Sequence, residues 1–225
     1  MGVSVGYSIY NAPTIYESGA GGGGGGGGGL PIAEIYNFPS GYTPLEKIVF
    51  EGKTAERVEV PLNGYRANYN KTDNIVELIA KVNNTDVNNC FFRYVPVSPN
   101  DSVSYYPNEI DIYSNNSSYW GFEGIAKNLI KEKFTLKYRY NQMWLNDRSE
   151  SYSWFTTINT KTSICICSSP VETTRLAYMD IFSFKIYEPT GNVIFFGVPA
   201  YDENNNVDGL IDIITNEFFQ HKWTT

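Results

Sequence analysis

Nine consecutive glycines occupy positions 21–29. They carry no side chains to bury, so the run cannot belong to a packed core, and glycine loses more backbone entropy on ordering than any other residue. As a free tether the run would span roughly 16 Å. As a stalk of parallel polyproline-II-like chains, which accept only glycine at their crowded axis, Gly21, Gly25 and Gly29 would lie along about 28 Å. We predict the stalk, and the tether remains the alternative.

A short peptide with an apolar alternation precedes the glycines. Alternate positions of an extended chain point to the same side, so four of its apolar residues would form one face. These residues have no core of their own to enter, which predicts an anchor that docks on another protein. The alternative is a tail in which the alternation arose by chance. The anchor residues are Val3, Val5, Tyr7 and Ile9, with Tyr10 beside them.

The chain after the glycines divides into a neck and a head. Residues 30–44 contain three prolines, which predicts a semi-rigid neck. From residue 45 onward, short alternating runs are separated by turn residues, a pattern typical of an all-β domain. We therefore predict a docking peptide (1–18), a stalk (19–29), a neck (30–44) and a head (45–225). The one helix expected in the head spans 123–133.

The composition bears on which partners the chain can have. The net charge is −7, only 18% of residues are charged, and no two Lys or Arg residues are adjacent, so we expect no nucleic-acid partner. No apolar stretch is long enough for a membrane span, and residues 1–6 lack the features of a secretory signal. We expect folding in a cytoplasm, three buried reduced cysteines, and no metal or cofactor, since the single histidine, His221, is far along the chain from the cysteines.

Several runs of the head carry a resemblance to a known fold. They are Arg175-Leu176, 181–188, 193–200, 208–212 and 215–219, together with the opening run 45–52 and the hairpin 144–147. Their order resembles the closing strands of concanavalin A-like (laminin-G-like) jelly-roll modules. The resemblance implies an all-β, two-sheet antiparallel sandwich. The segment 85–130 departs from the pattern and is predicted to be an elaborated loop region.

The order of anchor, glycine stalk and jelly-roll head resembles phage virion fibres, specifically the head fibres of crAss-like gut phages. The resemblance implies a trimeric, non-enzymatic structural subunit that assembles into the virion in the host cytoplasm. Its N-terminus would bind capsid or tail proteins, and its head would serve adhesion or decoration. A tail-associated receptor-binding protein is the alternative within this class.

Two carboxylates on one predicted strand are partly similar to the catalytic pattern of an enzyme. Jelly-roll glucanases place two glutamates on one strand because retaining hydrolysis needs a nucleophile and a proton donor close together. Here Glu109 and Asp111 match the first two positions, but Tyr113 or Ser114 stands where the donor should be. We predict no catalytic residues. A carbohydrate-active enzyme remains the third alternative, with a donor such as Glu123 supplied from elsewhere.

Two further motifs are candidate binding sites. The run 202–209 looks like a calcium loop, but Val207 and Ile213 occupy the places that require Gly and Glu, so a polar turn is predicted. In the Asn- and Ser-rich segment, aromatic rings on loops could stack on sugar rings of a host-surface glycan. The alternative is that these rings pack the loops down or fill a subunit contact. The candidate glycan-binding residues are Tyr105, Tyr106, Tyr119 and Trp120.

Overall fold

The structure is a computed structural model that describes residues 38–62, 74–95, 101–114, 117–139, 142–151, 162–167 and 176–224. The predicted docking peptide and stalk, including all of their named residues, lie outside this part of the chain. Within it are sixteen strands and one short helix, α2 (Ala126–Ile130).

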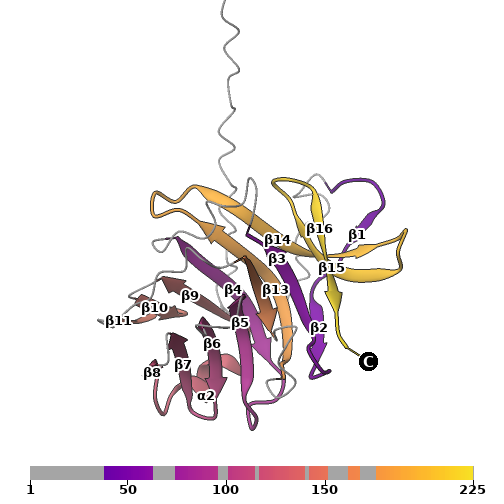
Figure 1. The fold of residues 1–225 in the computed structure, drawn as a ribbon. Coiled ribbons are helices and arrows are strands. Elements are labelled where there is room, and N and C mark those ends of the chain that lie inside the picture. The colour runs from indigo at the N-terminus through magenta and orange to yellow at the C-terminus, as the bar shows by residue number, and fades with distance from the viewer. Residues whose placement is uncertain are drawn as a thin grey trace, which may run out of the picture.

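The strands form two sheets, and every pairing is antiparallel. The all-β sandwich predicted from the sequence is confirmed (Figure 1). The first sheet has the order β11 (Arg148–Ser151), β10 (Gln142–Leu145), β9 (Phe134–Arg139), β4 (Ile75–Val82), β13 (Tyr178–Tyr187), β14 (Val193–Asp202), β15 (Val207–Asp212) and β16 (Glu217–Lys222). The second continues from β16 through β3 (Arg57–Pro61), β12 (Ser163–Cys167), β5 (Asn89–Val95), β6 (Asp101–Tyr106), β7 (Glu109–Ser114) and β8 (Ser117–Gly121).

The strand β16 belongs to both sheets. Its residues 217–220 pair with β15, whereas His221 and Lys222 pair with Val58 and Arg57 of β3. A strand that changes partners in this way forms a corner of the sandwich. The position of His221 is therefore where the two sheets join.

The main core lies between the two sheets. In β9, Phe134, Leu136 and Tyr138 point inward and alternate with more exposed polar residues. The ring of Phe92 on the second sheet lies 5.7 Å from that of Tyr138 and 6.3 Å from that of Phe184, both on the first sheet. Aromatic contacts thus connect the two layers.

A second, smaller cluster lies on the other face of β14 and β15. Phe195 is part of the main core and its neighbour Phe196 is part of this cluster, because successive strand residues point to opposite faces. Tyr42 joins it, and its ring lies 5.3 Å from that of Phe218. Tyr42 is in β1 (Tyr42–Pro44), which pairs with β14, so the described end of the predicted neck is attached to the head. The short β2 (Ile48–Glu51) pairs with β13 in a similar way.

The prediction of a loop region over 85–130 is wrong for the described residues. Strands β5 to β8 form a regular meander there, followed by α2, which is shorter than the expected helix 123–133. In β6, the buried Val103 and Tyr105 alternate with Ser102 and Ser104. The serines suggested a loop, but both are buried on the second face of the strand. The serines therefore belong to a sheet face that is covered, and they do not indicate a loop.

The three cysteines are free and buried, as predicted. Cys167 has φ 74°, which breaks the alternation of β12, and its side chain joins Ile164 and Ile166 in the main core. The side chains of Cys165 and Cys167 therefore lie on different faces of β12, although two positions separated by one residue ordinarily share a face. Burial raises the pKa of Cys165 to about 12 and raises that of Cys167, which keeps both sulfurs protonated at neutral pH.

Candidate functional site

The structure places the first predicted glycan-binding residue in the core. Tyr105 is in β6 with 0% of its surface exposed, so its ring cannot stack on a sugar. Its hydroxyl donates to the backbone oxygen of Thr85 at 2.9 Å and accepts from the backbone N–H of Asn108 at 3.3 Å. The prediction that Tyr105 binds a glycan is therefore wrong, because its ring is packed in the main core.

The other predicted aromatics lie on strands and do not form one platform with Tyr105. Tyr106 follows it on β6, points to the opposite face, and is partly exposed. Tyr119 on β8 packs partly against the core, and its hydroxyl donates to Oε2 of Glu150 at 3.0 Å. For Trp120 only the backbone is described, and it pairs with Asp111. A glycan role for Tyr106, Tyr119 and Trp120 stays a prediction.

The two candidate glucanase carboxylates lie on β7. Glu109 and Asp111 alternate with the core residues Ile110 and Ile112, so they share the sheet face away from the core. Asp111 is buried and Glu109 is partly exposed. Glu123, the donor that the enzyme alternative invoked, is exposed in the turn before α2.

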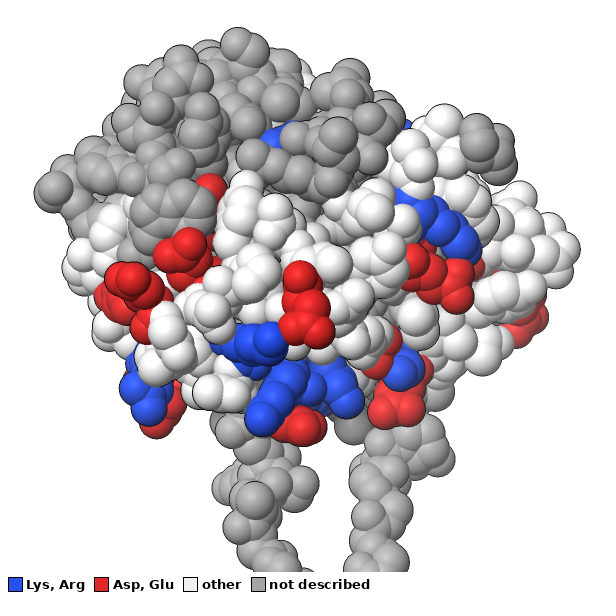
Figure 2. All heavy atoms as spheres, turned by 90° about the horizontal axis from the view of Figure 1, so that it is seen from below, with Lys and Arg blue, Asp and Glu red and all other residues white. Residues whose placement is uncertain are grey.

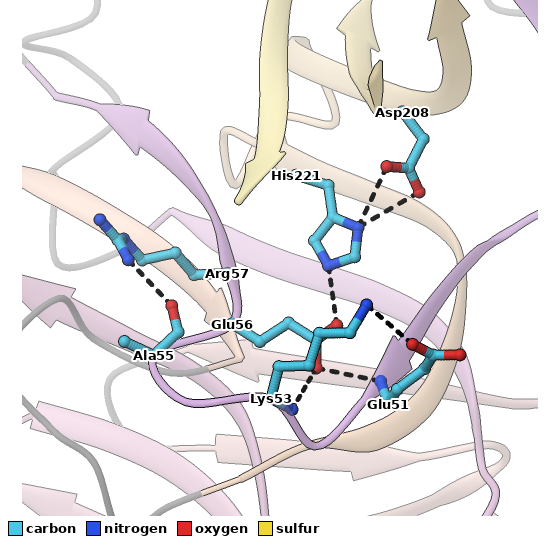
Figure 3. Close-up of polar contacts among 7 residues, drawn as sticks. All are labelled: Glu51, Lys53, Ala55, Glu56, Arg57, Asp208 and His221. Atoms are coloured by element: carbon cyan, nitrogen blue, oxygen red, sulfur yellow. Dashed lines mark hydrogen bonds and ion pairs between the residues drawn. The ribbon is translucent and has the colours of Figure 1, made fainter. Parts of the chain in front are cut away.

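The most elaborate polar arrangement in the described structure is centred on His221, a residue that the sequence analysis did not assign to a site. Its ring Nδ1–H donates to both carboxylate oxygens of Asp208 at 3.2 Å, and its Nε2–H donates to Oε1 of Glu56 at 3.1 Å (Figure 3). Asp208 is on β15, His221 on β16, and Glu56 in the loop before β3. The histidine thus bridges both sheets.

The local backbone holds Glu56 in place. Its side chain is 0% exposed, and Oε2 accepts the backbone N–H groups of Glu51 at 3.0 Å and Lys53 at 2.9 Å. Ala55 turns the chain with φ 50°, and its carbonyl accepts a hydrogen bond from Arg57. The loop 52–56 therefore folds around the carboxylate, which accepts hydrogen bonds from one of the loop's backbone N–H groups and from one at the end of β2.

The surroundings of His221 favour its charged form. Burial alone would lower its pKa, but the hydrogen bonds and charges of Asp208 and Glu56 outweigh it and raise the pKa above the ordinary value near 6.5. The ring also packs on Phe50, with 4.4 Å between centroids. A charge this deeply buried is tolerated when it is paired and hydrogen-bonded.

The geometry favours a structural role for His221. A general base needs an unprotonated ring nitrogen close to substrate, whereas both nitrogens here donate to carboxylates. The two carboxylates contact opposite ends of the ring and do not converge on one point. In keeping with this, the described residues contain no group of three or more His, Cys, Asp or Glu side chains suited to a metal ion.

An open groove adjoins this network. It has a cavity volume of about 450 Å³ and is lined by Tyr201, Asn206, Asp208, His221, Lys222 and Trp223, among others. Trp223 is 42% exposed, and the Nζ of Lys53 lies 4.0 Å from the centre of its ring. The sequence did not reveal this groove, because its lining comes from β14, β15, β16 and the residue after β16, which only folding brings together.

The charge of His221 makes stability depend on pH. The folded-state pKa lies above the unfolded value near 6.5, so the stabilisation is complete below that pH and is lost as pH rises through the folded-state pKa. Each unit by which the pKa is raised contributes about 1.4 kcal/mol. We expect the urea midpoint of the wild type to fall between pH 6 and 9. A His221→Gln variant should lack this fall, and an identical fall in that variant would contradict the assignment.

Charges of both signs mix on the surface of the head. Figure 2 shows basic side chains beside acidic ones on the face seen from below. Among the described ion pairs, Lys47 contacts Asp180 at 2.5 Å, and both Lys137 and Lys185 contact Glu77. The acidic partners in these pairs, Asp180 and Glu77, are largely buried, whereas Lys47 and Lys137 keep about 40% of their side chains exposed. Among the described residues, no helix combines the length and apolar character needed to cross a membrane.

Comparison with known proteins supports the fold. No protein-family model matches the sequence, and no curated protein is similar to it. Among solved structures, the chain is similar to domains LG4-5 of the mouse laminin α1 chain, with a TM-score of 0.50 and 12% identity over 81% of this chain. The head has a laminin G-like jelly-roll fold. The match covers 48% of the laminin chain, about half of its length, and at this identity it establishes the fold alone.

Proposed function

We propose that the chain is a non-enzymatic subunit of a phage virion fibre, most simply a head fibre, that displays a laminin G-like head on a glycine stalk. The observation that carries the proposal is the order of parts in one chain. A short apolar peptide without its own core precedes nine glycines, and these lead into a sandwich with a large core. A peptide that must dock, a spacer and a stable head are the parts that a displayed fibre needs.

The way the chain enters the head supports this proposal. Strand β1 is the last part of the neck and pairs with β14 through Tyr42, Thr43 and Pro44. Leu45 extends the attachment, because its N–H donates to the carbonyl of Pro199 at 3.0 Å. Force on the stalk would therefore act on hydrogen-bonded backbone and on the ring contact between Tyr42 and Phe218.

The anchor is tested by substitution on its two faces. Val3→Asp with Val5→Asp places charge on the apolar face, and Ser4→Asp with Ser8→Asp places the same charge on the polar face. We expect the first pair to abolish incorporation into virions, as deletion of residues 1–18 should, and the second pair to leave the copy number near that of the wild type. Normal incorporation of the deletion variant would refute the anchor.

Assembly and location distinguish the alternatives within this class. Three parallel copies would align their glycine runs, so the purified protein should have a solution mass near three times 25.4 kDa. A monomer on assembled particles would contradict the trimer. Labelled heads seen by electron microscopy on the tail, and not on the capsid, would favour the tail-associated receptor-binding protein.

The enzyme alternative is tested by chemistry. We expect no release of reducing ends from a panel of polysaccharides after long incubation, because the second glutamate that a retaining enzyme needs is replaced on β7. Hydrolysis that disappears in a Glu109→Gln variant would overturn the non-enzymatic proposal.

A further inference from the structure

The groove beside His221 combines aromatic surface with hydrogen-bonding groups. Trp223 offers one of the few exposed large apolar side chains in the described structure, and Tyr201 lies on the same groove. Asn206, Asp208 and Gln220 also line the groove and supply amide and carboxylate groups. Ligand sites have this composition, apolar rings with a few placed polar groups, and the volume of about 450 Å³ lies in their usual range.

The groove is held in shape by the network beneath it. His221 contacts the edge of the Trp223 ring at a centroid distance of 5.4 Å, and Lys53 lies over the ring. Lys53 is itself paired with Glu51 at 2.8 Å. Asp208 keeps 34% of its side chain exposed while both of its oxygens bind His221 (Figure 3). A ligand would therefore meet groups that are already positioned, which reduces the entropy lost on binding.

The charges around the groove indicate a neutral ligand. The charge of His221 is balanced by Asp208 and Glu56, and Lys222 lies 3.5 Å from Glu59. A strongly ionic ligand would meet both signs of charge. A sugar ring instead offers an apolar face to an aromatic side chain and hydroxyls to carboxylates and amides.

We propose that this groove is a saccharide-binding site of the head, with Trp223 and Tyr201 as stacking surfaces and Asp208 and Asn206 as hydroxyl partners. The inference rests on the proposed function, in which the head binds a surface. It moves the site from the rings of β6 and β8 to the corner formed by β14, β15 and β16. Affinity per groove is expected in the millimolar range, and several copies on one fibre would multiply it.

The test uses the purified full chain, labelled with ¹⁵N, and a panel of neutral methyl glycosides at millimolar concentration. We expect at least one glycoside to shift the indole N–H signal of Trp223, one of four tryptophans. Trp223→Ala and Tyr201→Ala should each weaken binding at least about tenfold, because each removes an aromatic anchor. The urea midpoint of each variant checks that the head is folded.

Tyr106→Ala is the matched control, since it removes a partly exposed ring from the site predicted by sequence. Binding that survives Trp223→Ala but is lost in Tyr106→Ala would overturn the groove and return the site to β6. The absence of a Trp223 shift with every glycoside would also overturn it. Neither result bears on fibre assembly, which virion incorporation measures separately.

Discussion

Replacing Glu56 with alanine is expected to destabilise the head by about 3–5 kcal/mol, because the change removes the buried one of the two carboxylates that balance the charge of His221. The carboxylate receives Nε2–H of His221 and the backbone N–H groups of Glu51 and Lys53, and its side chain is fully buried. Alanine provides no acceptor for any of these three donors. The free energy of unfolding from urea titration at pH 6, where His221 is charged, measures the loss.

Glu51→Ala is the control, since it removes the same type of side chain from the same network. Glu51 pairs with Lys53 at 2.8 Å, but 60% of its side chain is exposed, so a much smaller loss than that of Glu56→Ala is expected. Equal losses in the two variants would show that burial of Glu56 does not determine its contribution. A small loss in Glu56→Ala alone would show that the His221 network is dispensable.

Phe92→Ala should destabilise the head by about 3–5 kcal/mol through the cavity it leaves between the sheets. The ring is fully buried, and it contacts Tyr94 on its own strand as well as Tyr138 and Phe184 across the core. Both sheets lose contacts from one substitution. The loss is measured by the shift in the urea midpoint at constant slope, which reports stability without a change in the surface exposed on unfolding.

Phe182→Ala provides the comparison for an aromatic residue outside the core. Phe182 is in β13 next to Ile181, is partly exposed, and its ring lies 4.4 Å from the Nζ of Lys133. A cost of about 1 kcal/mol or less is expected from losing this contact. If Phe182→Ala proves as costly as Phe92→Ala, the core between the sheets is not the main source of stability.

The strands of the sandwich were predictable where alternation was regular. Residues 75–82 form β4, the alternating run that begins at Phe134 forms β9, and the turn at Asn146 joins β10 to β11 with φ 55°. The turn before β15 also follows its sequence, because Asp202 accepts the backbone N–H of Asn204 at 2.9 Å. Each of these elements is determined by residues that are neighbours in the sequence, so the sequence alone predicts it.

The meander β5 to β8 was not predictable in this way. Arg93 is fully buried on β5, and Ser102 and Ser104 are buried on β6. A polar residue in these strands is therefore no sign that its side chain faces solvent. Periodicity separates an apolar face from a polar one, but it does not show that the polar face is covered as well. The rings of Tyr105 and Tyr119 were assigned to loops for the same reason.

The network at His221 lay beyond sequence reasoning because its members are distant. Glu56 and His221 are 165 positions apart, and neither stands in a motif. His221 is the single histidine and lies far along the chain from the cysteines, so the sequence indicated only that it would not share a metal site with them. Its function in the fold depends on the corner in β16, which places one residue against both β15 and the loop before β3.

The pairing of β16 with β3 also limits when the head can fold. His221 meets Val58 in this pairing, so the second sheet cannot close until the ribosome has released almost the whole domain. Long-range pairing of this kind slows folding, because a large loop must be ordered before the contact forms. Until then the edge of β3 that pairs with β16 is open, and an unpaired strand edge promotes association between nascent chains. In the proposed trimer, each head would thus be completed only after synthesis of its own chain.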